Sequence, residues 1–265
     1  MSVQELDSLP PLQDLRPRTV TDQIFEHLYA RVVGLDLPPG AKLSEAEVAA
    51  RMAVSRQPVR DAFYRLSQLG FIQIRPQRAT TVTPISTEAV MQAYFIRSAL
   101  EQATMRVAAL TLQPSDWDGL ERLIDLQEAA SREDRRSDFH ALDDQFHRDI
   151  CAAAGKEFVW NLVRDNKGHM DRARFLSLSY GASTAFIEHR DILAALRARD
   201  PEAAAGALRD HLSHIEHILE RLRIDQPGIL AYSDKLEGVG LDTYNPMLSF
   251  ANGGTGTFWK EISKN

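Results

Sequence analysis

The sequence predicts a mainly α-helical protein with two domains: a small N-terminal domain of three helices and a β-hairpin, then an all-helical antiparallel bundle. A length of 265 residues favours two domains over one. Apolar residues recur at spacings of three and four along most of the chain, whereas residues 71–83 alternate as strands do. We place the domains at residues 19–85 and 86–225, with a flexible arm over 1–18 and a tail of unknown structure over 226–265.

The composition is that of an ordinary globular protein, with 44% hydrophobic and 26% charged residues. No run of about 18 apolar residues occurs, so we expect no membrane partner, and the N-terminus lacks a basic-then-apolar signal. The single cysteine, Cys151, suits a reducing compartment. We therefore expect a cytoplasmic protein in which Cys151, within an apolar helical stretch, is a buried apolar residue and not a nucleophile.

Charge is divided unevenly along the chain. Residues 16–85 hold ten Lys and Arg against six Asp and Glu, a net charge of +4, whereas residues 1–15 carry −3. Residues 86–265 hold 21 basic against 28 acidic residues, a net charge of −7. One basic segment on an acidic chain is typical of a nucleic-acid-binding module joined to another domain.

Two helices open the basic segment. Apolar residues repeat at helical spacing in the first of them, at Val20, Ile24, Leu28, Val32 and Leu35. The Leu-Pro-Pro-Gly run at residues 37–40 then ends this helix. Ser44 and Glu47 stand at the spacing of a capping box, which predicts a second helix over residues 45–52.

A third helix follows after a short turn, which completes a helix-turn-helix. Ser55 is a good N-cap residue, and Pro58 lies in the first turn, where its missing N–H costs little. Gly70 falls where a helix usually ends in a left-handed residue. One apolar face is formed by Val59, Ala62, Phe63 and Leu66.

The polar residues of this third helix gather at its N-terminal end, at Ser55, Arg56, Gln57 and Arg60. That end of a recognition helix meets base edges and phosphates in the major groove of DNA. Arginines on an ordinary solvated helix face are the alternative explanation. The basic charge of the segment and the helix-turn-helix arrangement favour DNA binding.

The alternating segment after the third helix predicts a hairpin. Residues 71–75 and 79–83 are its two strands, and residues 76–78 form the turn between them. A hairpin in this position is the wing of a winged helix-turn-helix domain. Arg78 near its tip is suitably placed to contact the sugar-phosphate backbone or the minor groove.

From Ser86 onward the pattern is wholly helical, without a strand signal as far as residue 225. It predicts an antiparallel bundle. The first expected helix ends near Thr111, and the second starts with Ser115 and Asp118 in capping-box spacing. Three more are expected from Ser137 to Gly155 and at about residues 157–180 and 185–199. Asp200 and Pro201 open a last helix that reaches about Arg223.

One set of residues in the bundle has the chemistry of a metal site. Asp143 and His147 are four apart, so they leave the same face of one helix, and His189 and His211 lie on later helices. Three imidazoles and a carboxylate suit a divalent ion, with zinc expected first and nickel or manganese as alternatives. Histidines that merely decorate helices are the other explanation, as His214 shows.

The N-terminal domain resembles that of GntR-family transcription regulators. The resemblance spans about residues 19–84 and rests on Leu-Pro-Pro-Gly-Ala-Lys-Leu-Ser-Glu at 37–45, Val-Ser-Arg-Gln-Pro-Val-Arg-Asp-Ala at 54–62 and Leu-Gly-Phe-Ile at 69–72. It implies that Arg56 and Arg60 contact operator bases and phosphates, with Ser55 and Gln57 assisting them.

The second domain resembles the FCD ligand-binding domain of the FadR-type GntR subfamily over about residues 88–222. The matching segments are 143–150, 188–193 and 200–204, the last leading to His211. The resemblance implies that Asp143, His147, His189 and His211 hold a metal on which a small carboxylate effector docks. Arg97 and Arg174 are candidates to pair with that carboxylate, because guanidinium binds it through two hydrogen bonds. A surface salt bridge explains each arginine equally well.

Together these features predict a homodimeric transcription regulator, a repressor in preference to an activator, that binds palindromic operator DNA and responds to a small organic or sugar acid. Two alternatives remain. In the first alternative, the metal itself is the signal to which the regulator responds. In the second, the helical domain is a metal-dependent hydrolase or lyase. Against the enzyme, no second carboxylate is specifically marked as a general base.

Overall fold

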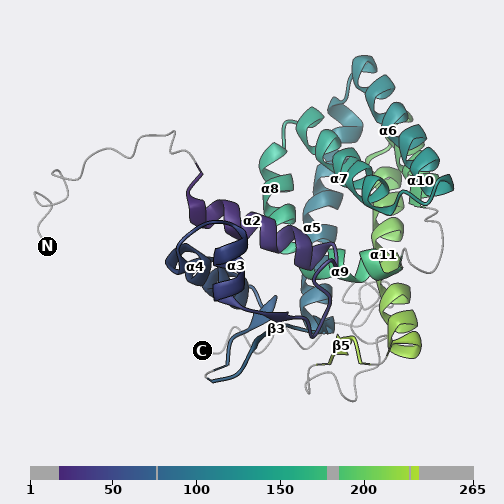
Figure 1. The fold of residues 1–265 in the computed structure, drawn as a ribbon. Helices are drawn as coiled ribbons and strands as arrows, with labels where there is room; N and C mark the ends of the chain where they lie inside the picture. Colours follow the sequence, from purple (N-terminus) through teal and green to yellow (C-terminus); the bar gives the residue numbers. More distant parts are fainter. Residues whose placement is uncertain (1–17, 76, 178–184, 227, 233–265) are drawn as a thin grey trace, which may run out of the picture. The chain divides into compact units, whose positions relative to one another are not determined.

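The computed structural model describes residues 18–75, 77–177, 185–226 and 228–232 (Figure 1). The chain divides into two compact units between Thr83 and Pro84, and each is described by itself. The predicted arm, apart from Arg18, and the tail beyond residue 232 lie outside the described residues.

The N-terminal unit holds three helices and three short strands in its described part. They are α2 (Val20–Val33), β1 (Lys42–Leu43), α3 (Glu45–Arg51), α4 (Arg56–Gln68), β2 (Ile72–Gln73) and β3 (Thr80–Val82). Thr19 caps α2 and exchanges hydrogen bonds with Asp22, whereas the Ser44 hydroxyl accepts from the Glu47 N–H at the start of α3. The predicted helix-turn-helix is therefore confirmed.

The ends of α4 differ in how well the sequence predicted them. Gly70 has φ of +77°, as expected of the residue that terminates the helix. Ser55 has the extended backbone of an N-cap, but its hydroxyl makes no capping hydrogen bond within the described part of the chain. The predicted role of its side chain as a cap is therefore wrong, and the hydroxyl stays at the exposed surface.

The predicted hairpin is present as part of a larger sheet. Strand β3 pairs antiparallel with β2, placing Ile72 opposite Val82, and with β1, placing Lys42 opposite Thr81. The order among the described strands is β1-β3-β2. Strand β1 was missed because two residues carry no alternation that a sequence pattern could reveal.

The core of the N-terminal unit forms where α4 packs on α2. The predicted apolar face of α4 is confirmed, since Val59, Ala62, Phe63 and Leu66 are all fully buried. They share the interior with Ile24, Leu28 and Val32 of α2. This packing leaves the polar N-terminal end of α4 at the surface.

The C-terminal unit is a helical bundle, as predicted (Figure 1). Its described helices are α5 (Thr87–Thr111), α6 (Pro114–Arg132), α7 (Arg136–Ala153), α8 (Glu157–Asn166), α9 (Gly168–Ser177), α10 (Ala185–Arg197) and α11 (Pro201–Asp225). Asp200 caps α11 as expected, because its carboxylate accepts from the Glu202 and Ala203 N–H groups. The bundle buries a large apolar cluster around Phe146, Ile150, Ile192 and Leu208.

Two details of the predicted bundle are wrong. Helix α6 begins at Pro114, and its capping box joins Gln113 to Asp116 where Ser115 and Asp118 were expected. The single helix expected at 157–180 is two helices, α8 and α9, which meet at Lys167 and Gly168. Glycine is a poor helix former, which favours a break at this point. Residues 178–180 lie outside the described residues.

A short parallel pair joins the two ends of the bundle's described chain. Strand β4 (Ile85–Ser86) pairs with β5 (Leu230–Ala231), which brings the segment after α11 back to the start of α5. Leu230 is buried in the cluster that contains Ile85, Val90 and Leu222. The sequence showed no strand signal between residues 86 and 225, and this pair lies at the edge of that range and in the tail, whose structure the sequence left open.

Two further expectations concern Cys151 and membrane-crossing helices. Cys151 is 1% exposed, and burial raises the pKa of its thiol to about 12, as suits an inert apolar residue. Within the described ranges, no helix combines the length and the hydropathy that a membrane-crossing segment requires.

We expect Leu66→Ala to lower the free energy of unfolding of the N-terminal unit by about 2–5 kcal/mol, because it leaves a cavity between α4 and α2. Urea denaturation followed by circular dichroism measures the loss. The control is Leu69→Ala, because Leu69 is 45% exposed beside the same helix and its loss should cost less than about 1 kcal/mol. Equal losses in the two variants would contradict this packing.

Candidate metal centre and DNA-binding surface

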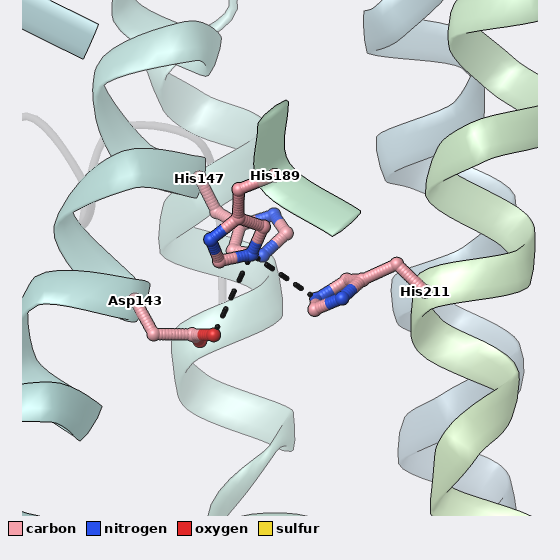
Figure 2. A group of neighbouring side chains, drawn as sticks. All are labelled: Asp143, His147, His189 and His211. Atoms are coloured by element: carbon pink, nitrogen blue, oxygen red, sulfur yellow. Dashed lines mark hydrogen bonds and ion pairs between the residues drawn. The ribbon is translucent and has the colours of Figure 1, made fainter. Parts of the chain in front are cut away.

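Four predicted metal ligands lie together inside the bundle (Figure 2). Asp143 and His147 are one turn apart on α7, His189 comes from α10 and His211 from α11. All four side chains are buried, and one ligand atom from each lies within 4.8 Å of the others. Residues separated by up to 68 positions in the chain thus converge on one point.

A hydrogen-bond acceptor holds the Nδ1 atoms of His189 and His211. Nδ1 of His189 lies 2.6 Å from Oε1 of Gln127, and the Gln127 amide N–H donates to the Leu142 carbonyl, which fixes Oε1 as the acceptor. Nδ1 of His211 lies 2.7 Å from Oε2 of Glu188. These contacts place a hydrogen on Nδ1 and leave Nε2 with a lone pair.

His147 also has a carboxylate close to its Nδ1 atom, as an ion pair without hydrogen-bond geometry. Its Nδ1 lies 2.7 Å from Oε2 of Glu101 on α5. Burial alone would raise the pKa of the Glu101 carboxyl, but Arg97 and His147 lower it to about 2, so Glu101 stays an ionised acceptor. Nε2 of His147 has no hydrogen-bond partner among the described residues.

The bare nitrogens face one another. Nε2 of His189 lies 3.4 Å from Nε2 of His211 and 3.6 Å from Oδ1 of Asp143, as the dashed lines in Figure 2 show. Burial lowers the pKa values of His189 and His211 well below the usual range, so both rings are neutral. Two lone pairs pointed at each other repel unless a cation lies between them. The donor set therefore fits a metal ion.

Asp143 supplies the negative charge of the cluster. Burial alone would raise the pKa of its carboxyl, but Arg174, His147 and His189 hold it well below the usual range. Nη2 of Arg174 lies 2.6 Å from Oδ2 of Asp143, so this arginine fixes one carboxylate oxygen while Oδ1 faces His189. One carboxylate and three imidazoles are a set that borderline divalent ions favour.

The two arginines predicted to bind an effector both lie beside this cluster. Nε of Arg97 lies 2.5 Å from Oε1 of Glu101, and both side chains are 1% exposed. Nη1 and Nη2 of Arg97 have no hydrogen-bond partner in the described ranges. Arg174 is 14% exposed and pairs with Asp143. Neither arginine forms the surface salt bridge considered as the alternative.

Sequence reasoning missed the residues that orient the histidines: Glu101, Gln127 and Glu188. Glu188 adjoins His189 in sequence, which is a weak signal, and it also contacts the exposed His214 at 3.0 Å. Glu101 and Gln127 lie on α5 and α6, far along the chain from the ligands. Only packing of those helices against α7 and α10 brings them near.

The predicted DNA-binding residues lie at the surface of the N-terminal unit. Ser55, Arg56, Gln57 and Arg60 are exposed at the N-terminal end of α4, and Arg78 is exposed in the hairpin. Gln57 donates to Oδ1 of Asp61 at 2.9 Å. The arrangement can present four polar side chains to a groove in DNA.

Glu45 is a residue of this surface that the sequence did not single out. Its Oε2 lies 3.7 Å from Nη2 of Arg56 and 3.5 Å from Nε of Arg60. One carboxylate from the start of α3 thus contacts both candidate recognition arginines. Its negative charge offsets part of their positive charge.

Family models match both units. The model "Bacterial regulatory proteins, gntR family" matches residues 20–82, and the model "FCD domain" matches residues 92–214. The first range contains α2 to β3, and the second contains all four residues of the buried cluster.

Curated relatives agree with these models. The chain is 37% identical over 206 residues to "HTH-type transcriptional repressor RspR" of Escherichia coli K12, covering 77% of this chain and 90% of that protein. It is 32% identical over 198 residues to "Probable D-xylose utilization operon transcriptional repressor" of Paenarthrobacter nicotinovorans, covering 74% and 86%. These relatives are transcription regulators and not enzymes, which argues against the hydrolase or lyase.

Solved structures share the fold. E. coli McbR/YncC matches with a TM-score of 0.65 at 21% identity over 77% of this chain and 98% of that chain. A GntR transcriptional regulator from Rhodococcus sp. RHA1 matches with a TM-score of 0.63 at 21% identity over 76% and 97%. Taken with the family models, these likenesses confirm the predicted resemblance: the chain belongs to the gntR family of bacterial regulatory proteins and joins a gntR DNA-binding domain to an FCD domain.

Proposed function

We propose that this regulator is a cytoplasmic homodimeric repressor whose binding to operator DNA is controlled by a small carboxylate effector at a metal centre in its FCD domain. The observation that carries the proposal is the buried convergence of Asp143, His147, His189 and His211. Repression is supported by the relatives, two of which bear the word repressor in their names.

DNA binding would use the exposed end of α4. A two-fold dimer presents two such helices to the half-sites of a palindrome. Arg56 or Arg60 would read guanine through two hydrogen bonds, whereas Ser55, Gln57 and Arg78 would contact phosphates or assist. Affinity from phosphate contacts should fall steeply as salt rises.

Asp143, His147, His189 and His211 would hold a divalent ion, with zinc expected first and nickel or manganese as alternatives. A bound ion supplies a positive centre for a carboxylate. Arg97 would hold the same carboxylate through its Nη1 and Nη2 donors, because Glu101 fixes only Nε. Arg174 keeps Asp143 oriented and ionised.

An effector changes the DNA affinity of the protein only when it binds the DNA-binding conformation and the non-binding conformation with different affinities. If the metal itself is the signal, metal alone releases the DNA. Titrating a protein–DNA complex with zinc, and then with small acids at constant zinc, separates the two cases. We expect release only in the second titration. Release by zinc alone would favour the metal sensor.

We expect His211→Ala to lower zinc affinity by at least about a hundredfold, because it removes one of four ligands from a buried site. Isothermal titration of the metal-stripped protein measures the change. The matched control is His217→Ala, which removes an exposed histidine from the same helix and should leave zinc affinity unchanged. Similar losses in both variants would show that zinc binds elsewhere.

We expect Arg60→Ala to weaken binding to a duplex that the wild-type protein selects from a random pool, by about 1–3 kcal/mol, and to relax its preference at one base pair of each half-site. Fluorescence anisotropy with single-base variants of the duplex measures both effects. Arg31→Ala, which removes an exposed arginine of α2, is the control for net charge. An unchanged base preference in Arg60→Ala would contradict direct readout by this residue.

Glu45→Ala should raise affinity for random DNA and reduce the ratio of selected to random binding, because it frees Arg56 and Arg60 from a shared carboxylate. Glu47→Ala removes the same charge from an exposed position on the same helix. Competition binding at fixed salt gives the ratio. The positioning role is refuted when both variants lower the ratio equally.

A further inference from the structure

Of the four candidate metal ligands, His211 is the most exposed. Asp143, His147 and His189 are fully buried, whereas His211 is 7% exposed. A divalent ion loses part of its hydration shell when it enters a buried site, and polar groups along the way must replace the lost water. The route by which an ion reaches the centre should therefore be lined with ligand groups near His211.

Two of the four residues that support the ligands reach the solvent. Glu101 and Gln127 are buried, but the side chain of Arg174 is 14% exposed and that of Glu188 is 23% exposed. A cation that approaches beside Arg174 meets a positive charge, whereas one that approaches beside Glu188 meets a carboxylate. Electrostatics therefore favours entry on the side of Glu188.

Glu188 joins the buried centre to the exposed face of α11. Its Oε2 lies 2.7 Å from Nδ1 of His211, and its Oε1 lies 3.0 Å from Nδ1 of His214. His214 follows His211 by one turn of α11, and its side chain is 54% exposed. A single carboxylate thus contacts one candidate ligand on its inner side and one exposed histidine on its outer side.

A second exposed histidine completes this group. His217 follows His214 by one turn of α11, and the centroids of the two rings are 6.1 Å apart. Residues three apart on a helix leave the same side, so the two imidazoles and the Glu188 carboxylate can contact one ion. Imidazole and carboxylate are both ligands of borderline divalent ions.

We propose that Glu188, His214 and His217 form a surface site that captures a divalent ion and delivers it to the buried centre. This inference rests on the proposed function, because it takes the buried cluster as the final site of the ion. The surface site has three ligand groups that compete with water, so it binds an ion more weakly than the four buried groups and releases it inward. Histidines that only hold Glu188 in place are the competing explanation.

A site on the entry route changes rates without changing the final affinity. It lowers the barrier for an ion that enters and, equally, for an ion that leaves, because both use the same route. Its removal should therefore slow zinc loading and zinc release by the same factor and leave the dissociation constant of the buried site unchanged. A residue that only shapes the buried site changes the dissociation constant instead.

The test is zinc loading of the metal-stripped full chain, as wild type and as the double variant His214→Ala, His217→Ala. Stopped-flow transfer from a chromophoric zinc indicator measures the loading rate, and an excess of chelator measures the release rate. We expect both rates to fall roughly tenfold in the double variant, because the lining of an entry route raises association rates by about that factor or more. Isothermal titration should show the same dissociation constant of the buried site for both proteins.

Both histidines are exposed, so the double variant leaves no cavity, and circular dichroism checks its fold. The matched control is His27→Ala, which removes an exposed histidine from α2 of the N-terminal unit and should leave both rates unchanged.

Three other outcomes overturn the proposal. Unchanged rates in the double variant would show that the ion enters elsewhere. Unequal changes of the two rates, which alter the dissociation constant, would show that the histidines only support the buried site. If the wild-type protein binds no zinc, both this inference and the metal centre of the proposed function are overturned.

Discussion

The structure depends on three imidazoles and one carboxylate that face one another inside the bundle, beside its large apolar cluster. Burying such groups is unfavourable unless each is paired. The pairing comes from a second layer: Glu101, Gln127 and Glu188 hold the three rings, and Arg174 holds Asp143. The Nδ1 atoms of His189 and His211 are thereby hydrogen-bonded, and Nε2 of His147 and Oδ1 of Asp143 have no hydrogen-bond partner among the described residues.

This arrangement ties together helices that are remote in sequence. The ligands come from α7, α10 and α11, while the second layer adds α5, α6, α9 and the start of α10. The ligands and their supporting residues therefore come from most helices of the bundle. Helix α9 carries Arg174, which contacts the candidate ligand Asp143. It also carries Arg172, whose Nη1 donates to the carbonyl of Pro84, the first residue of the C-terminal unit.

The N-terminal unit separates its apolar and polar residues. Its core is purely apolar, and its polar residues stay outside on one end of α4. Glu45 contacts both Arg56 and Arg60 at that end without burying them. Exposed ion pairs of this kind contribute little stability.

The sequence by itself determined the features that repeat locally. Helical spacing predicted α2, α4 and most of the bundle, and the spacing of Asp143 and His147 placed two ligands on one face. Family motifs added His189 and His211. Short strands such as β1 and β5 lay beyond this reasoning, because two residues have no periodicity, and the break at Lys167 left no clear signal.

Only the tertiary structure decided which polar groups the site contains. Nothing local distinguishes Glu101 or Gln127 from other residues of α5 and α6, yet packing sets both against the ligand histidines. Likewise Asp144, which points away from Asp143 around the same helix, meets Lys167 because α8 ends there. Hydrogen bonds and charge act over a few ångströms in space, so partners remote in sequence are known only when the helices are packed.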